Sequence, residues 1–280
     1  MQIIESVSEM RSQAAKLKAG GKTIALVPTQ GSLHAGQEAL IRAAVTKADV
    51  VVVSIFVNPL QFGPNELGAS LTPPLDEDAK RCAECGAHLV FAPNREEIYP
   101  RGYSSYVSEE AVAKPLDGVS RPTHFRGVAT IMVKLFNIVQ PDFAFFGQKT
   151  AQRAAVVRKM AADLGYAVEV VVVPTVRDPD GQPEGVRNPG FTATLWQESL
   201  SLSKALTKAK EMSDAGVRST DRIIAEATHI LSQYRRVRII YVSIVDVATM
   251  EAAREVIPGK TMLAIAAWAD EMRVIDNIIL

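Results

Sequence analysis

Two short polar segments carry side chains suited to binding a small acid and a phosphate group. In residues 27–36, VPTQGSLHAG, Gly36 lets a ligand approach the backbone closely, and the start of the following helix offers N–H groups that favour phosphate. His34 would then face the phosphate oxygens. In VNPLQFG, the amides of Asn58 and Gln61 can donate and accept hydrogen bonds, which suits a substrate with hydroxyl groups and a carboxylate.

Positive charge occurs in two further segments. In FFGQKT, Lys149 follows a strand and a glycine and is placed as a point charge for phosphate, while Gln152 lies just inside the next helix. His124 stands between Arg121 and Arg126 in RPTHFRG, which is consistent with an anion site. Each residue also has a structural interpretation: a histidine can cap a helix, a lysine can be solvated, and the arginines can pair with surface carboxylates.

The hydrophobic pattern predicts the framework that must position these segments. Over the first two thirds of the chain, short β-branched or aromatic runs alternate with amphipathic helical spacing, which is typical of βαβ units and a parallel sheet. Ligands of such sheets bind beyond the carboxyl ends of the strands, where the polar segments fall. The predicted strands are 23–27, 50–56, 89–92, 143–146 and 168–173. The predicted helices are 38–46, 76–85, 128–138 and 151–164.

The composition changes after Pro174, where a loop rich in Asp, Gly and Pro spans residues 177–189. Short connections between the later strands are typical of an antiparallel sheet, so the second half is expected to be α+β. We predict an α/β fold with a parallel-sheet domain over residues 1–175 and a smaller α+β domain over residues 176–280. The elements predicted in the second half are helices 195–215 and 221–233 and strands 237–245, 261–268 and 273–278.

The overall composition narrows the class of protein. Of 280 residues, Lys plus Arg and Asp plus Glu each number 31, so net charge gives no argument for a nucleic-acid or membrane partner. No apolar run is long enough to span a bilayer, and Glu5 and Glu9 do not fit a signal peptide, which predicts a cytoplasmic protein. Cys82 and Cys85, near His88, could indicate a metal or redox site, but the pair lacks the further ligands of structural zinc and a structural role is favoured.

Many of these segments resemble the pantothenate synthetase, or pantoate–β-alanine ligase, family of the nucleotidyltransferase superfamily, which has an H-x-G-H signature. The likeness covers nearly the whole chain and rests on long matches. They are VPTQGSLHAG, VVVSIFVNPLQFG, LVFAP with EEIYP, RPTHFRGVAT with KLFNIVQPD, FFGQK, VPTVRDPDG, RN and the closing IDN. The resemblance implies a Rossmann-like first domain, a smaller C-terminal domain that closes over it, and a homodimer.

The resemblance also implies a two-step reaction. The pantoate carboxylate attacks the α-phosphate of Mg-ATP to give pantoyl adenylate and pyrophosphate, and the β-alanine amine then displaces AMP. The implied catalytic residues are His34, Gln37, Lys149 and Arg187. The implied substrate-binding residues are Gln61, Gln152, Asn58, His124, Gln30 and Thr29, with ATP contacts from Gly36, Gly147, Lys149, Val176, Gly185 and Val186 and help with Mg²⁺ from Asp78.

Several site positions depart from the family pattern. Gln37 stands where the second signature histidine belongs, and glutamine can donate a hydrogen bond to phosphate but cannot become a cation. Gly185 and Val186 replace two serines that grip ATP phosphates in the family, and Glu184 precedes them. The remaining departures are Gln30 and Leu60 for methionines, Thr150 for an acid, and Leu71, Thr72 and Pro73 for YPR.

Two functional hypotheses follow. The first is an enzyme of this family that forms an amide at the expense of ATP, with an activity that the substitutions leave open. The second is a family scaffold with a disabled or repurposed pocket, whether natural or engineered, which binds or converts another small ligand and no longer uses ATP well. A dinucleotide-dependent dehydrogenase is set aside, because no G-x-G-x-x-G follows the first strand.

Overall fold

The protein is described by a computed structural model over residues 1–62, 74–186 and 188–280. Its internal contacts divide the chain into two units. The first unit comprises Met1–Gly147 and Val156–Val173, and the second comprises Gln148–Ala155 and Pro174–Leu280. Each unit has a sheet and a hydrophobic core of its own.

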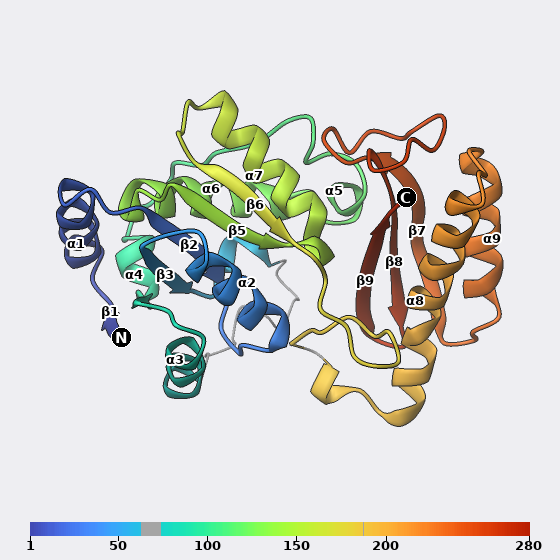
Figure 1. Ribbon diagram of the computed structural model, residues 1–280, viewed down its shortest axis with the longest axis horizontal. Coiled ribbons are helices and arrows are strands. Elements are labelled where there is room, and N and C mark those ends of the chain that lie inside the picture. Colours follow the sequence, from blue (N-terminus) through green and yellow to red (C-terminus); the bar gives the residue numbers. More distant parts are fainter. Residues whose placement is uncertain (63–73, 187) are drawn as a thin grey trace. The chain divides into compact units, whose positions relative to one another are not determined.

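The first unit is built on a six-stranded parallel sheet in the order β1-β4-β3-β2-β5-β6 (Figure 1). β2 (Ile24–Thr29) and β3 (Val50–Ile55) are buried at every residue, as expected of strands covered on both faces. The order of the strands reverses between β2 and β5, and the carboxyl edge at such a switch point is where open α/β sheets bind ligands. The other strands are β1 (Gln2–Ile4), β4 (Leu89–Phe91), β5 (Phe143–Gly147) and β6 (Glu169–Val173).

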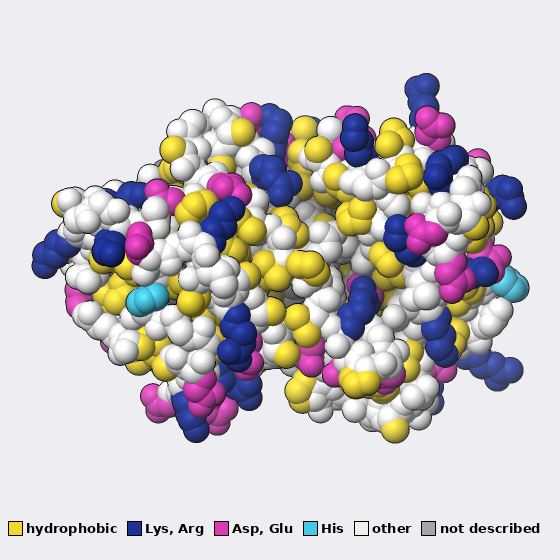
Figure 2. All heavy atoms as spheres, viewed as in Figure 1, with side chains coloured by type: hydrophobic (Ala, Val, Ile, Leu, Met, Phe, Trp, Pro, Cys, Tyr) yellow, Lys and Arg dark blue, Asp and Glu magenta, His cyan; other side chains and the backbone are white. Residues whose placement is uncertain are grey.

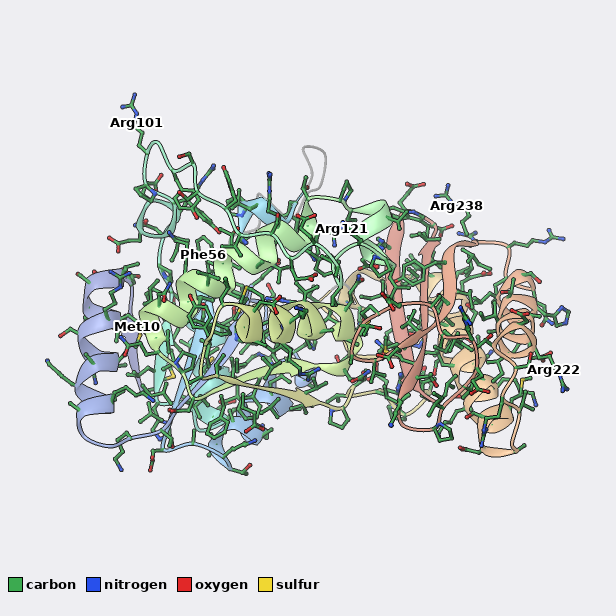
Figure 3. The ribbon with its side chains drawn as sticks, turned by 90° about the horizontal axis from the view of Figure 1, so that it is seen from above. Met10, Phe56, Arg101, Arg121, Arg222 and Arg238 are labelled. Atoms are coloured by element: carbon green, nitrogen blue, oxygen red, sulfur yellow. The ribbon has the colours of Figure 1, made fainter. Side chains whose placement is uncertain are left out.

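Helices cover both faces of this sheet. α2 (Ala35–Val45) packs against β2, β3 and β5, and its Ile41 shares a buried core cluster with Val27, Val53 and Phe145 of the sheet. α6 (His124–Val139) lies on the opposite side of the sheet in Figure 1. Met10 of α1 is fully buried and points toward the body of the unit (Figure 3). The remaining elements are α1 (Val7–Ala19), α3 (Leu75–Glu84), α4 (Arg95–Ile98), α5 (Asp117–Ser120), α7 (Ala151–Asp163), whose start belongs to the second unit, and the 3-10 turn η1 (Pro59–Gln61).

The second unit packs two helices against a three-stranded antiparallel sheet in the order β7-β8-β9. Leu206, Ile223 and Leu263 are among the fully buried residues of its core. Short connections join β8 to β9, as the sequence predicts. The elements are α8 (Ala193–Asp214), α9 (Thr220–Ser232), β7 (Val237–Asp246), β8 (Thr261–Ala269), β9 (Met272–Ile279) and the 3-10 turns η3 (Gln148–Thr150) and η4 (Asn188–Gly190).

The predicted fold class is confirmed, with a parallel-sheet α/β unit and a smaller unit carrying an antiparallel sheet. Sequence reasoning missed β1 and α1, since β1 has three residues and α1 buries only Met10 and Ala14. Contacts separate the units after Val173, and they also assign Gln148–Ala155 to the second unit. The domain ranges 1–175 and 176–280 stay a prediction.

The face of the molecule seen in Figure 2 carries charges of both signs. Acidic and basic side chains are interspersed on the face seen in Figure 2, in agreement with the equal numbers of the two charges in the sequence. None of the helices in the described ranges is long and apolar enough to cross a membrane.

Candidate active site

The turn that follows β2 is held in an unusual conformation by a buried carboxylate. Gly31 and Ser32 have φ angles of 82° and 53°, in the left-handed region that favours glycine. Asp78 of α3 accepts hydrogen bonds from the Ser32 and Leu33 backbone N–H groups, each at 2.7 Å, and is 1% exposed. These two charge-assisted bonds offset the backbone strain and fix the entry to α2.

His34 is the N-cap of α2, and Gln37 closes a reciprocal capping box with it. The Gly36 N–H donates to Nδ1 of His34 at 3.1 Å, and the His34 N–H donates to Oε1 of Gln37 at 2.9 Å. Because Nδ1 accepts, the neutral ring carries its proton on Nε2, which is therefore a donor. The glutamine that replaces the family histidine thus has a structural task at the helix start.

Asn58 uses its side chain to shape the turn that follows β3. Its Nδ2 donates to the Gly127 carbonyl at 2.9 Å, and its Oδ1 accepts from the Leu60 N–H at 3.2 Å and from the Tyr99 hydroxyl at 3.0 Å. Burial, with a smaller contribution from Tyr103, raises the pKa of Tyr99, so its hydroxyl stays a donor. Asn58 is 1% exposed, and its side chain joins the turn to α6 and to Tyr99.

Gln61 ends this turn and is held from three sides. Its carbonyl oxygen lies 3.0 Å from Nδ1 of His124 and accepts from Nη2 of Arg121 at 3.2 Å. Its side-chain Oε1 accepts from Nε2 of Gln30 at 2.6 Å. Arg121 lies just before α6 (Figure 3). Within the first unit, the structure therefore brings together four of the predicted residues, Gln30, Gln61, Asn58 and His124.

The two arginines that flank His124 differ in their partners. Arg121 bonds to the main chain of Gln61, and the Arg126 guanidinium lies 4.8 Å from the centre of the Tyr106 ring, a cation–π contact. For Arg126, pairing with a surface carboxylate, the structural alternative, is not among the ion pairs of the described residues.

Thr29 and Gly147 end two adjacent strands of the site edge. The Thr29 hydroxyl donates to the Ser54 carbonyl at 2.9 Å and accepts from the Gly31 N–H at 3.3 Å, so it ties β2 to β3. A Cβ built at Gly147 would meet nothing within 4 Å, so no packing at this position demands glycine. Their predicted contacts with substrate and ATP stay predictions.

In the second unit, Lys149 is fixed by two separate segments. Its ammonium donates to the Glu184 carbonyl at 2.8 Å and to the Pro183 carbonyl at 3.4 Å. Asn277 of β9 donates from Nδ2 to the carbonyls of Gln148 and Lys149, at 2.9 and 3.2 Å. Gln148 returns a bond of 2.8 Å to Oδ1 of Asn277. Hydrogen bonds therefore hold both the backbone and the ammonium group of this lysine in place.

The predicted nucleotide loop runs close to that ammonium. A Cβ at Gly185 would come within 2.6 Å of Nζ of Lys149, so the glycine leaves room for the lysine. Val176 accepts from the Glu184 N–H at 2.9 Å, and Val186 is 50% exposed. Arg187 lies outside the described residues, as do positions 71–73.

The same loop is anchored by an ion pair that sequence reasoning missed. Arg177 donates from Nη1 and Nη2 to the two carboxylate oxygens of Asp276, at 2.6 and 2.9 Å, and also bonds to the Gly181 carbonyl at 3.0 Å. Asp276 is 2% exposed, and burial raises its pKa although Arg177 opposes that shift. The signal in the sequence is the IDN motif, which contains both Asp276 and Asn277.

The residues around Asp78 do not fit a protein-bound magnesium ion. Both of its oxygens face backbone N–H groups, and no group of three or more His, Cys, Asp or Glu side chains among the described residues is placed to hold a metal. These contacts give Asp78 a positioning role, and its predicted help with Mg²⁺ stays a prediction. Cys82 and Cys85 are buried free thiols, and burial raises the pKa of Cys82 to about 12, which disfavours the thiolate that a metal or redox site needs.

Comparison with known proteins adds the decisive observation. Residues 2–279 match the family model described as pantoate-beta-alanine ligase. The chain belongs to this family. The pantothenate synthetases of Moorella thermoacetica and Thermotoga petrophila are 42% and 44% identical over 280 residues, which is 100% of this chain and 99% and 100% of theirs.

Solved structures of pantoate–β-alanine ligases agree with the fold. The pantothenate synthetase of Thermus thermophilus has a TM-score of 0.93 at 35% identity, covering 100% of this chain and 99% of that one. A Francisella tularensis ligase, solved in complex with beta-gamma ATP and beta-alanine, has a TM-score of 0.81 at 26% identity, covering 100% and 97%.

The predicted site residues fall in both units of this chain. His34 and Gln61 lie in the first unit, and Lys149 and the buried Gln152 lie in the second. Convergence of these four side chains on one ligand stays a prediction. Tyr99, Asp276 and Asn277 are the additional residues that the hydrogen bonds reveal.

Proposed function

We propose that this chain is an ATP-dependent ligase that joins pantoate to β-alanine through a pantoyl adenylate. The observation that carries the proposal is the match of residues 2–279 to the pantoate–β-alanine ligase family. In the first step, a pantoate carboxylate oxygen attacks the α-phosphorus of ATP and pyrophosphate leaves. In the second step, the β-alanine amine attacks the acyl carbon and AMP leaves, so the phosphate serves only to make a leaving group.

The phosphate groups are assigned to His34, Lys149 and backbone amides. Support for His34 comes from its place at the start of α2 and from its donor at Nε2. Gly36, in the first turn of that helix, lets the triphosphate approach the backbone. Lys149 supplies a positive charge, and Gln37 supplies an amide donor in place of the family histidine.

The pantoate is assigned to Gln61 and Gln152, with His124 and Thr29 beside the reacting groups. Both glutamines are buried polar residues, at 3% and 7% exposure. Asn58 supports Gln61 through the turn that both residues form. The nucleotide is assigned to the loop that carries Val176, Gly185, Val186 and Arg187, with Gly147 at the end of β5.

Magnesium enters this proposal only as the counter-ion that ATP carries on its phosphates, where Mg²⁺ is usually bound. No step is assigned to a metal held by Asp78. We further propose a homodimer, on the basis of the resemblance to the family; light scattering after size-exclusion chromatography tests it.

The decisive experiment follows both half-reactions with the purified protein. ATP and pantoate together should release pyrophosphate, and addition of β-alanine should yield pantothenate and AMP. When one carboxylate oxygen of pantoate is ¹⁸O-labelled, the label should appear in AMP. Absence of pyrophosphate release and of ATP binding would overturn the proposal and favour a scaffold that serves another ligand.

A further inference from the structure

Gln30 and Gln61 form a pair of amides at the centre of the first unit's part of the site. Gln30 follows β2 directly, Gln61 ends η1, and Nε2 of Gln30 donates to Oε1 of Gln61 at 2.6 Å. Gln61 is 3% exposed, and Gln30 is half-buried. The residue that carries the pantoate assignment therefore has a side-chain partner that the family pattern, with methionine at this position, does not provide.

The main chain of Gln61 is fixed by other contacts. Its carbonyl oxygen is held by His124 and Arg121. α6 also approaches closely, since a Cβ at Gly127 would lie 2.3 Å from the Leu60 carbonyl oxygen and 2.9 Å from the Gln61 nitrogen. The freedom left to Gln61 is rotation of its side-chain amide, which exchanges a donor for an acceptor at the same place.

We propose that Gln30 is a specificity-determining positioning residue that sets the orientation of the Gln61 amide. This inference rests on the proposed function. With Oε1 of Gln61 bound to Gln30, its Nε2–H group is the one directed to the ligand. An N–H donor matches the carboxylate or hydroxyl oxygens of a 2-hydroxy acid and disfavours a ligand that presents N–H groups at that point.

The negative charge of the substrate favours this arrangement over the one in which both amides are rotated by half a turn. If both amides rotate together, their mutual bond survives, but Gln61 then presents a carbonyl oxygen to an anionic substrate. Two acceptors facing each other repel, so pantoate favours the orientation in which Gln30 donates. A side chain that cannot donate leaves Gln61 free to adopt either orientation.

A double-mutant cycle tests whether Gln30 acts through Gln61. Gln30→Met keeps the length of the side chain and removes its donor; we expect the KM for pantoate to rise roughly threefold to tenfold, with the KM for ATP changed less than about twofold. In a Gln61→Met background, Gln30→Met should add little further change, because the amide it orients is gone. Gln197→Met, at an exposed glutamine of α8, is the matched control.

Gln30→Glu extends the test. A carboxylate can only accept, so the Gln61 N–H group turns toward residue 30 and away from the ligand. The KM for pantoate should then rise further, on the order of a hundredfold. Equal effects of Gln30→Met in both backgrounds, or no effect on the KM for pantoate, would overturn the proposal.

A measurement without substrate separates this proposal from the proposed function. The side-chain NH₂ signals of Gln61 in a ¹⁵N–¹H spectrum, assigned by their loss in Gln61→Met, should shift in Gln30→Met and not in Gln197→Met. Unshifted signals would overturn the pairing. Shifted signals in a protein that does not turn over pantoate would support the pairing and overturn the ligase assignment instead.

Discussion

Asp78 and Ser32 are 46 positions apart in the sequence and are joined by a 2.7 Å hydrogen bond from the Ser32 N–H to the Asp78 carboxylate. Together with the bond to Leu33, this contact holds the turn that delivers His34 to the start of α2. The carboxylate therefore acts through the backbone on the part of the site to which we assign the phosphates.

Replacing this carboxylate should damage both stability and ATP binding. Asp78→Asn places an NH₂ group or a neutral oxygen opposite two N–H donors, so we expect the free energy of unfolding to fall by about 2 to 3 kcal/mol. The KM for ATP should rise roughly tenfold, because a loosened turn misplaces His34. Urea denaturation and steady-state kinetics measure the two effects. Asp76→Asn, exposed in the same helical turn, should show neither.

Tyr99 should support the substrate turn through Asn58. Tyr99→Phe removes the hydroxyl that donates to Oδ1 of Asn58, and we expect a loss of about 1 kcal/mol in stability and a roughly threefold rise in the KM for pantoate. Tyr103→Phe keeps the ring contact and removes no hydrogen bond seen among the described residues, so it is the control. Identical kinetics of the two variants would show that the bond to Asn58 is unimportant.

Asn277 should act on catalysis from a distance by holding the Lys149 turn. Asn277→Ala removes the bonds to the Gln148 and Lys149 carbonyls, so the rate of adenylate formation should fall roughly tenfold. Single-turnover kinetics with ATP and pantoate measure this step directly. In a Lys149→Ala background, Asn277→Ala should have little further effect on the rate of adenylate formation. An undiminished effect there would contradict the positioning role.

Gln37→His tests the chain's departure from the family signature. The substitution restores a side chain that can carry positive charge near the phosphates, so adenylate formation should accelerate roughly tenfold. It also removes Oε1 as the acceptor for the His34 N–H, at a cost of about 1 kcal/mol in stability. Pyrophosphate release and thermal unfolding report the two effects, and a slower reaction would show that the capping box matters more than the charge.

The lowered pKa of Asp142 predicts that the free energy of unfolding depends on pH. Burial raises its pKa, but hydrogen bonds from Lys18 and from the Ile24 N–H outweigh burial and hold the pKa below its ordinary value. A lowered pKa in the folded state stabilises the protein above the unfolded value, near 4, and this contribution is lost as the pH falls through the folded value. Asp142→Asn should therefore cost about 1 kcal/mol at pH 7 and progressively less below about pH 4. Urea denaturation at several pH values tests this, and Asp214→Asn, which changes an exposed carboxylate, is the control.

The sequence predicts most strands of the two sheets, because strands such as Val50–Ile55 are buried on both faces and read as nearly continuous apolar runs. It also indicates which polar residues follow the strands. It does not predict what holds them: the partners of Ser32 and Gln61 come from distant segments and have no periodic signal. From the sequence, Gln37 is interpreted as the loss of the second histidine of the family signature. Its capping role depends on backbone geometry, which the sequence does not show.

The central place of β2 has a consequence for folding. β2 borders β5 on one side, and its Ile24 N–H bonds to a residue 118 positions later. Pairing over such a separation is slow, because a long loop must close before the contact forms. Until β5 arrives, a nascent chain presents one edge of a largely apolar strand with unpaired backbone groups, a template for aggregation. Refolding yield should therefore decrease steeply with protein concentration and recover when a chaperone shields that edge.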